Sequence, residues 1–295
     1  MSQADGKHVL VSVVVPTKNS EGEIRKCLDS LKLQSYSKIE IIVVDDESRD
    51  KTREIAEKYG AKVVNTRSGR SKARNIGAKI SKGEFILFMD SDQELDRDLI
   101  SRAVELATFK KLDAVRFPKI IKGDSFFGKV RNVESYLNYR EGKIRGVPRF
   151  LKKSTFLKSG GYDEKLAFGE DRELWKRLIQ SGYKLSVLDV PIYEIDNSIQ
   201  KRLIKNYKYG MQYPEYQKKV ADVSTVLFES VNILKYIKSV SSASELLYFP
   251  FVVIFKIFNM IAFLLGIFSS LTQVIHKRVE WWSSYWQKIV KLGKK

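Results

Sequence analysis

Two aspartates one residue apart follow a short apolar run. The run, Phe-Ile-Leu-Phe-Met at 85–89, is followed directly by Asp90, Ser91 and Asp92. Its aromatic and β-branched content predicts a buried strand rather than a surface helix. Paired carboxylates where a strand opens into a loop offer the hard oxygen ligands that Mg²⁺ or Mn²⁺ prefers, and such a cation can bridge a diphosphate. Taken alone, the triplet is equally compatible with a solvated turn.

Strand patterns alternate with helix patterns through the first part of the chain. The predicted strands cover 9–15, 39–44, 62–64 and 85–89, and the predicted helices cover 24–33, 51–59 and 71–80. This alternation predicts β-α-β units and a mainly parallel α/β sheet. In such sheets, ligands bind beyond the carboxyl ends of the strands. We therefore expect Pro16 and Thr17, Asp45 and Asp46, and the acidic triplet to share one rim.

The following stretch, from about 96 to 195, has a mixed pattern. Helices are predicted over 99–109 and 170–180, and strands over 114–117 and 185–188. A basic helical segment follows at 201–208. No internal repeat or low-complexity stretch is visible.

Five short motifs occur in a fixed order. They are VVVPTKN at 13–19, IVVDDES at 42–48, ARNIG at 73–77, MDSD at 89–92 and FGED at 168–171. In this order they resemble glycosyltransferase family 2, over about residues 9–210. The resemblance implies a GT-A fold, a nucleotide-diphosphate sugar as donor, and transfer with inversion of the anomeric carbon.

The resemblance also implies which residues contact the donor. Pro16, Thr17 and Asp46 would hold base and ribose, and a carboxylate such as Asp46 can accept a hydrogen bond from a base N–H. Asp46 could instead cap the next helix, and Glu47 stands where the family usually has glycine. Arg70 and Lys72 lie in a basic stretch that could contact the diphosphate or form a solvated basic face. The full expected donor-binding set is Pro16, Thr17, Asn19, Asp45, Asp46, Arg70, Lys72, Arg74, Asp90 and Ser91.

The expected cofactor is Mn²⁺ or Mg²⁺. The resemblance makes Asp92 the direct metal ligand and puts Asp90 near the ribose or the metal. Glu94 follows two residues later, and Glu194 stands where many relatives carry a histidine. Both are oxygen donors that suit these ions, so both are candidate further ligands, although Glu194 could equally be a surface residue.

Glu170 and Asp171 open a predicted helix. Carboxylates favour helix N-termini in any protein, so a simple capping role is the alternative. The resemblance implies that Asp171, with Glu170 beside it, is the general base that takes the proton from an acceptor hydroxyl. A retaining hydrolase fits poorly because the rim at 16–17 and 45–46 would have no role. The polymer-synthase signature Gln-x-x-Arg-Trp is absent, which disfavours processive synthesis.

Charge and cysteine content limit the class of protein further. The 295 residues carry a net charge of +18, and residues 200–295 hold 15 basic against 5 acidic residues. The electrostatic field of such a positively charged protein attracts nucleotides, anionic lipids or nucleic acid. No nucleic-acid-binding motif is present, so no nucleic-acid partner is expected. One cysteine and a polar N-terminus without a signal-peptide pattern predict a catalytic part in the cytosol.

An apolar segment lies within the basic tail. Residues 248–271 include 18 apolar residues among 24, a helical length of about 36 Å that is enough to span a bilayer. Both flanks are basic, which disfavours a single crossing. We expect membrane attachment, with a bent, re-entrant or interfacial helix pair somewhat favoured over a spanning helix. A dimer interface is the soluble alternative.

These patterns predict a GT-A catalytic domain over 1–198, a basic helical connector over 199–240 and a membrane-associating helical tail over 241–295. The expected function is transfer of one sugar to a hydroxyl of a lipid-linked or saccharide acceptor at the cytoplasmic face of the cell membrane, with an oligomer possible through the tail. The alternatives are a polyprenyl-phosphate sugar transferase and a non-catalytic membrane-bound nucleotide-sugar binder.

Overall fold

The computed structural model describes residues 9–140, 148–166, 168–220 and 239–292, with side chains of the last helix described to residue 273. The described chain divides into two compact units, Met1–Asn197 with Ile233–Val252, and Ser198–Asn232 with Val253–Lys295.

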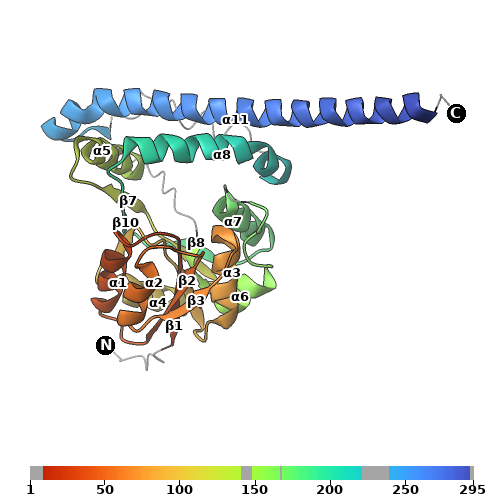
Figure 1. The fold of residues 1–295 in the computed structure, drawn as a ribbon. Coiled ribbons are helices and arrows are strands. Elements are labelled where there is room, and N and C mark those ends of the chain that lie inside the picture. The colour runs from red at the N-terminus through yellow and green to blue at the C-terminus, as the bar shows by residue number, and fades with distance from the viewer. Residues whose placement is uncertain (1–8, 141–147, 167, 221–238, 293–295) are drawn as a thin grey trace. The chain divides into compact units, whose positions relative to one another are not determined.

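A seven-stranded sheet forms the centre of the first unit (Figure 1). Its strand order is β3-β2-β1-β4-β8-β6-β9. The four strands β1 to β4 run parallel, and only β8 runs antiparallel to its neighbours. The bounds are β1 (Val11–Thr17), β2 (Ile39–Asp45), β3 (Lys62–Asn65), β4 (Phe85–Phe88), β6 (Ala114–Arg116), β8 (Pro148–Lys152) and β9 (Leu185–Val187).

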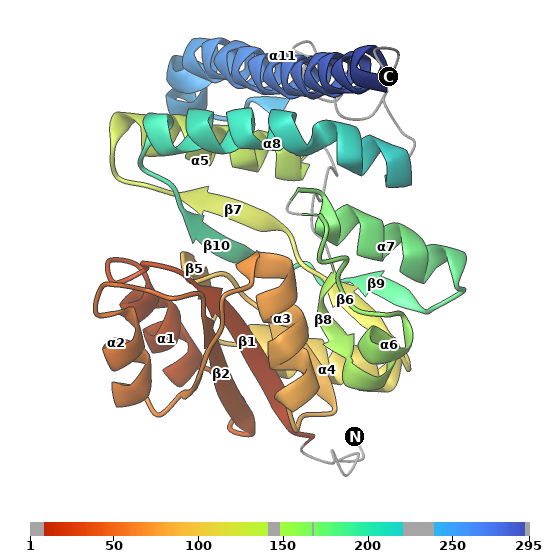
Figure 2. The ribbon, with the colours of Figure 1, turned by 45° about the vertical axis from the view of Figure 1, so that its right-hand side comes forward.

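Helices cover both faces of this sheet, as parallel strands with crossover helices require (Figure 2). One core contains the apolar faces of α1 (Ile24–Lys32), α2 (Thr52–Lys58) and α4 (Leu99–Phe109). The other contains those of α3 (Gly69–Ile80), α6 (Lys153–Lys158) and α7 (Glu170–Gln180). Alternate residues of β1 enter the two cores, with Val13 and Val15 in the first and Val14 in the second.

Close packing of α3 against the sheet depends on Gly77. A Cβ at this position would overlap Cγ1 of Val14 and lie 3.2 Å from Cγ2 of Val44. The missing side chain therefore lets the helix backbone press onto β1 and β2. This contact fixes the height at which the N-terminal half of α3 meets the rim of the sheet.

A small second sheet and a long helix complete the first unit. The sheet has the order β5-β10-β7, with β5 (Gln93–Leu95), β10 (Ile192–Ile195) and β7 (Lys119–Lys122). The helix α5 (Phe126–Arg140) packs beside β7, and its Arg140 makes a two-oxygen ion pair with Glu245. The ring of Phe126 packs edge-on against Phe251 at 4.9 Å between centroids. The first turns of α11 (Ala243–Leu292) are thereby attached to α5.

The second unit pairs α8 (Ile199–Val220) with the remainder of α11. The predicted helix pair over 248–271 is wrong, because these residues lie within one continuous helix that also contains Pro250. The stretch offers no cluster of turn-forming residues at which the chain could reverse. Among the described residues, one helix, Ala243–Gln273, is long and apolar enough to cross a membrane.

Candidate functional site

Three parallel strands end at one rim of the sheet. Thr17, the last residue of β1, pairs in register with Asp45, the last residue of β2, and β4 ends immediately before the acidic triplet. Because parallel strands share a direction, the loops that follow them gather on the same side. The expectation that these loops lie at one rim is therefore confirmed by the sheet register.

Asp46 is the partly exposed carboxylate of the β2 loop. The backbone N–H of Ser68 donates a hydrogen bond to it at 2.9 Å, and the ammonium of Lys18 lies 3.0 Å away. Burial alone would raise the pKa of Asp46, but the Ser68 N–H and the Lys18 ammonium outweigh it and lower the pKa. Asp46 is therefore an ionised acceptor held between two loops.

The neighbouring polar residues of the rim hold the loops in shape. Asp45 is fully buried and accepts a hydrogen bond from the backbone N–H of Ser48 at 2.9 Å. Asn19 adopts a left-handed backbone with φ of 48°, and its side-chain oxygen accepts from the N–H of Arg49 at 2.9 Å. Pro16 and Thr17 are themselves buried at the end of β1. In this structure Asp45 stabilises the loop after β2, and its side chain is not exposed for contact with a sugar nucleotide.

A buried arginine joins the two acidic motifs. Arg74, on the inner side of α3, has no exposed side-chain surface, and its Nη2 lies 2.6 Å from Oδ1 of Asp90. Its Nη1 lies 3.1 Å from Oε1 of Glu170 and 3.4 Å from Oδ1 of Asp171. One guanidinium therefore holds the end of β4 beside the start of α7.

The second oxygen of Asp90 is also engaged. Nη2 of Arg149, on β8, lies 3.1 Å from Oδ2 of Asp90, and the backbone N–H of Asp90 donates to Oε1 of Gln93 at 3.0 Å. Burial would raise the pKa of Asp90, but Arg149, Arg74 and Arg70 hold that pKa well below its usual range. Asp90 is thus a fixed anion whose two oxygens already have cationic partners.

Glu170 and Asp171 occupy different environments at the start of α7. Gly169 precedes them with φ of 74°, a left-handed conformation that turns the chain sharply into the helix. Glu170 is buried and pairs with Arg70 at 2.8 Å as well as with Arg74. Burial and then the charge of Asp171 raise the pKa of Glu170. The Asp171 side chain keeps 19% of its surface exposed, so it is the one of the two that an incoming molecule can reach.

The ARNIG motif has a structural role beyond Arg74. Asn75 accepts a hydrogen bond from the N–H of Tyr162 at 2.9 Å and donates one to its carbonyl oxygen at 2.8 Å. The Tyr162 ring then lies 5.2 Å from the guanidinium carbon of Arg74. Burial, followed by the charge of Asp171, raises the pKa of Tyr162, so its phenol stays neutral. Asn75 and Tyr162 together form one wall around the arginine.

The four predicted metal ligands do not form one preassembled cluster. Among the residues that the structure describes, no group of three or more His, Cys, Asp or Glu side chains is placed to hold one ion. Oε2 of Glu194 lies 2.7 Å from the ammonium of Lys119, and the two oxygens of Asp90 face arginines. Asp90 and Glu194 are therefore each paired with nearby basic side chains.

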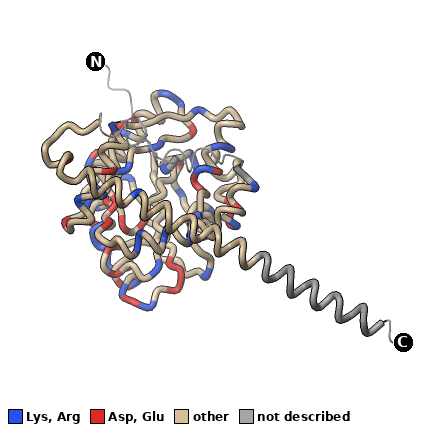
Figure 3. Tube along the Cα trace, turned by 90° about the horizontal axis from the view of Figure 1, so that it is seen from above, with Lys and Arg blue, Asp and Glu red and all other residues tan. Residues whose placement is uncertain are grey.

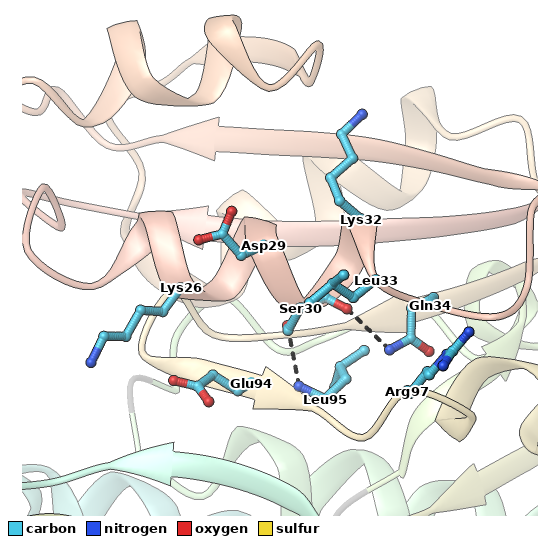
Figure 4. Close-up of a pocket in the computed structure, with 9 residues that line it drawn as sticks. All are labelled: Lys26, Asp29, Ser30, Lys32, Leu33, Gln34, Glu94, Leu95 and Arg97. Carbon is cyan, nitrogen blue, oxygen red and sulfur yellow. Dashed lines mark hydrogen bonds between the residues drawn. The ribbon is translucent and has the colours of Figure 1, made fainter.

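Glu94 lines a cavity to which Asp90 does not contribute. That cavity has a volume of about 790 Å³ and is lined from α1 by Lys26 and Asp29 and from β5 by Glu94 and Leu95 (Figure 4). Gln93 precedes Glu94 on the strand and turns the other way, toward Asp90, because successive strand residues alternate in direction. This alternation explains why Glu94 is separated from Asp90.

Asp92 is the predicted ligand that would remain for a divalent cation at the end of β4. Asp92 lies in the loop between β4 and β5, two residues beyond Asp90. Mg²⁺ commonly takes only one or two protein carboxylates and completes its shell with substrate phosphates and water. Asp92 together with a bound diphosphate fits that pattern, and a four-carboxylate protein site does not.

Three further residues were predicted to contact the sugar nucleotide: Ser91, Arg70 and Lys72. The hydroxyl of Ser91 donates to the Ser20 hydroxyl at 2.9 Å, which ties the acidic triplet to the β1 loop. The ion pairs of Arg74 with Asp90, Glu170 and Asp171 form the Arg74 network. Arg70 joins this network because it also pairs with Glu170. Lys72 is an exposed residue of α3. Its role as a diphosphate contact stays a prediction.

The family model for glycosyl transferase family 2 matches residues 12–160, about half of the chain. The chain belongs to glycosyl transferase family 2. It is a glycosyltransferase with the GT-A fold, as its motifs predicted.

Several relatives support this family 2 assignment. The uncharacterized glycosyltransferase EpsJ of Bacillus subtilis (strain 168) is 29% identical over 72% of this chain and 69% of its own length. The poly(ribitol-phosphate) β-N-acetylglucosaminyltransferase TarS of Staphylococcus aureus (strain MW2) is 32% identical over 62% of this chain but only 34% of its own length. The chain thus matches about a third of TarS.

Solved structures agree on the fold. A mannosyltransferase of Pyrobaculum calidifontis, in complex with GDP-Man and Mn²⁺, superposes with a TM-score of 0.59 at 16% identity, covering 88% of this chain and 87% of its own. TarS of S. aureus superposes with a TM-score of 0.51 at 20% identity, covering 88% of this chain and 55% of its own. At such identities the likeness extends to the GT-A fold.

Arg149, Gln93 and Tyr162 are site residues that the sequence did not reveal. Arg149 lies in β8, a strand with no clear alternation of polar and apolar residues. Tyr162 follows two glycines at 160 and 161, a pattern that indicates only a turn. The signal that could have drawn attention to Arg149 is a single charged residue beside the apolar pair Phe150 and Leu151.

Proposed function

We propose that this family 2 enzyme transfers one sugar, with inversion, from a nucleotide-diphosphate sugar to a hydroxyl of a lipid-linked acceptor at the cytoplasmic face of the cell membrane. The observation that carries the proposal is the Arg74 network. Its guanidinium pairs with Asp90 after β4 and with Glu170 and Asp171 at the start of α7. Donor-side and acceptor-side carboxylates are thereby held side by side.

Donor binding is assigned to the rim of β1, β2 and β4. Asp46 is an ionised acceptor suited to an N–H or hydroxyl of the nucleoside, and Arg70 is suited to the diphosphate. In support, TarS 1–349 of S. aureus has been solved in complex with UDP and with UDP-GlcNAc. The sugar and base that this chain accepts depend on loop shape rather than on these residue types.

Asp92 is assigned as the protein ligand of Mn²⁺ or Mg²⁺. When bound, the ion supplies Lewis-acid stabilisation of the departing nucleotide diphosphate. Arg70, Arg74 and Arg149 lower the pKa of Asp90, and Arg70, with 34% of its side chain exposed, is the most accessible of the three to an incoming diphosphate. The Mn²⁺ complex of the P. calidifontis mannosyltransferase supports a divalent ion in this fold.

Asp171 is assigned as the general base. It is partly exposed, and it lies beside the buried Glu170, which Arg70 and Arg74 hold in place. The Asp171 carboxylate takes the proton of the acceptor hydroxyl as the oxygen attacks the anomeric carbon. Glu170 acts as a positioning residue because its Oε1 is paired with both Arg70 and Arg74.

The membrane part of the proposal rests on the tail. We assign catalysis to residues 1–198, a connector to 199–240 and membrane association to 241–295. The long apolar helix Ala243–Gln273 and the net charge of +10 over residues 200–295 support attachment to an anionic lipid surface. An acceptor that carries a lipid would meet the enzyme there.

Two substitutions test the chemistry. Asp171→Asn is expected to keep donor binding and to lower kcat by about 10²–10⁴-fold, the usual contribution of a general base. Asp92→Asn is expected to weaken donor binding measured with Mn²⁺ present. Asp98→Asn, at an exposed carboxylate, serves as the control and should change neither. Calorimetric donor titration and a radiolabelled transfer assay give the two readouts.

The same pair of readouts separates the alternatives. Transfer to a phosphate acceptor that survives Asp171→Asn would indicate a polyprenyl-phosphate sugar transferase, because an anionic acceptor needs no base. Donor binding by the unaltered chain without transfer to any acceptor would indicate a non-catalytic binder. Either result would contradict the proposal.

A further inference from the structure

α8 and α11 cross at two glycines within the second unit. A Cβ at Gly210 would overlap the carbonyl oxygen of Phe263 and lie 3.0 Å from Cα of Gly266. A Cβ at Gly266 would overlap the carbonyl oxygen of Tyr207 in the same way. The two backbones therefore touch at a point where no side chain fits, which fixes the crossing.

Polar side chains reinforce this crossing. The side-chain amide of Asn206 donates a hydrogen bond to Oδ1 of Asn259, and the hydroxyl of Tyr207 donates to Oγ of Ser269 at 3.0 Å. The rings of Tyr213 and Phe263 pack edge to face at 5.3 Å. In membranes, helices commonly associate through small residues at their interface and through hydrogen bonds between polar side chains of the two helices. The contact region on α11 runs from Asn259 to Ser269, the middle of the apolar stretch.

The two outer faces of this pair differ in chemistry. On α8, the exposed residues are mostly polar or charged: Ile199, Gln200, Lys201, Ile204, Lys208, Gln212, Glu215, Gln217 and Lys218. On α11, they recur at helical spacing and are large and apolar: Ile254, Ile257, Phe258, Ile261, Leu264, Leu265, Phe268 and Leu271. Figure 3 shows the described part of α11 as almost uninterrupted tan. The apolar stripe is about 27 Å long.

These two faces decide between a spanning and an in-plane helix. If α11 crossed a bilayer, its middle would lie in hydrocarbon, and the Gly210–Gly266 contact would bring α8 there too. The exposed charges of Lys208, Glu215 and Lys218 would then be in lipid, where charged side chains are strongly disfavoured. With α11 parallel to the surface, the stripe enters the leaflet and α8 stays on the aqueous side.

We infer that the α8–α11 pair is an in-plane membrane-binding unit, with the α11 stripe in an anionic lipid leaflet and α8 covering its aqueous side. The net charge of +10 over residues 200–295 favours anionic lipid as the partner. The inference deepens the membrane-surface part of the proposed function. It does not depend on the transfer chemistry, so donor-binding and transfer assays can fail without affecting it.

Vesicle flotation of the full chain tests the partner. Vesicles of phosphatidylcholine with phosphatidylglycerol are expected to float about tenfold more protein than phosphatidylcholine alone at low salt, and added salt should reduce the difference. No flotation with either vesicle, together with a dimer of the full chain in solution, would show that a second copy covers the stripe. That result would overturn the inference.

Depth measurements test the in-plane orientation. Ile254, Ile261 and Phe268 are spaced seven residues apart on the stripe and can each be replaced by Cys and labelled with an environment-sensitive fluorophore. Cys27 is buried, and its burial raises the pKa of the thiol, so it stays unlabelled. Shallowly placed lipid quenchers are expected to quench all three labels equally. A label at Ile261 quenched only by deep quenchers, with the outer two quenched by shallow ones, would indicate a spanning helix.

A label on α8 completes the test and provides the control. In the vesicle-bound full chain, Lys208→Cys is expected to react with a membrane-impermeant maleimide as fast as it does without vesicles. Protection of Lys208→Cys by vesicles would place α8 in lipid and contradict the inference. Both outcomes can be read without any sugar nucleotide.

Discussion

At the scale of single residues, Arg74 organises the site. It is fully buried, and its charge is compensated by the carboxylates of Asp90, Glu170 and Asp171 and by the ring of Tyr162. Arg74→Met would leave Glu170 buried with fewer cationic partners. We expect this change to lower the free energy of unfolding by about 3–5 kcal/mol, the usual cost of breaking a buried ion pair from one side.

Urea denaturation measures this effect, with Lys72→Met as the matched control. Lys72 lies on the same helix but is exposed, so its replacement should change stability by less than about 0.5 kcal/mol. Adding Glu170→Gln to Arg74→Met should restore part of the loss, because the buried negative charge is removed. Equal stability of Arg74→Met and the unaltered chain would contradict the proposed importance of the network.

The pH dependence of stability reports on Asp90. Burial would raise its pKa, but Arg149, Arg74 and Arg70 lower it well below the usual value. A carboxyl with a depressed pKa in the folded state stabilises the protein above its unfolded pKa of about 3.9, and this stabilisation is lost as pH falls through the folded pKa. Asp90→Asn should therefore be more destabilising near about pH 7 than near about pH 3.

Chemical denaturation at the two pH values checks this prediction. The exposed Glu57→Gln variant provides the comparison for general charge effects. A constant difference between Asp90→Asn and the unaltered chain across this range would show that the carboxylate charge of Asp90 adds nothing to stability.

The sequence could predict residue types at the rim but not their partners. The acidic triplet and the 170–171 pair were identifiable because they follow an apolar strand and open a helix. Whether Asp90 faces a metal or two arginines depends on Arg149, which lies 59 residues away and reaches the site only through the pairing of β8 with β4. Long-range pairing of this kind leaves no local pattern.

At the scale of elements, Gly77 sets the position of α3. Gly77→Ala would push a Cβ into the stiff, β-branched side chain of Val14. We expect the free energy of unfolding to fall by about 1–3 kcal/mol, the typical cost of overpacking a core. Thermal or urea denaturation measures it, with Gly22→Ala as control because nothing lies within 4 Å of a Cβ there. Equal effects of both changes would contradict the close contact of α3 with β1.

The strongly patterned elements were predictable, and the weakly patterned ones were not. The helix Leu99–Phe109 has a clear apolar period that matches its burial, and the strands β1, β2 and β4 contain apolar runs that are mostly or wholly buried. The three strands of the small sheet have only three or four residues each, too few to establish a period. The helix α5 was not predicted because its buried face contains the ion-paired residues Arg131 and Glu134. These charged residues interrupt the apolar pattern by which a buried helix face is recognised.

At the scale of the whole molecule, a family 2 catalytic unit is joined to a helical unit with an apolar outer stripe. The tail was recognisable from composition, but its form was not, because a continuous helix and a helix pair share the same apolar content. The stripe could also join two copies of the chain. Size-exclusion chromatography with light scattering is expected to show concentration-dependent association without lipid that disappears on binding anionic vesicles. Association that vesicles leave unchanged would indicate a permanent dimer.

The proposed function depends on carboxylates at the sheet rim that use a divalent cation to bind and activate a sugar nucleotide. Calorimetric titration of UDP-, GDP- and dTDP-sugars into the full chain, with Mn²⁺ and then with a chelator, tests it most directly. We predict that one of these donors binds with Mn²⁺, and that chelation or Asp92→Asn weakens binding about tenfold or more, as expected for losing one ion contact to the diphosphate. Absence of binding by every sugar nucleotide with Mn²⁺ or Mg²⁺ present would contradict the account.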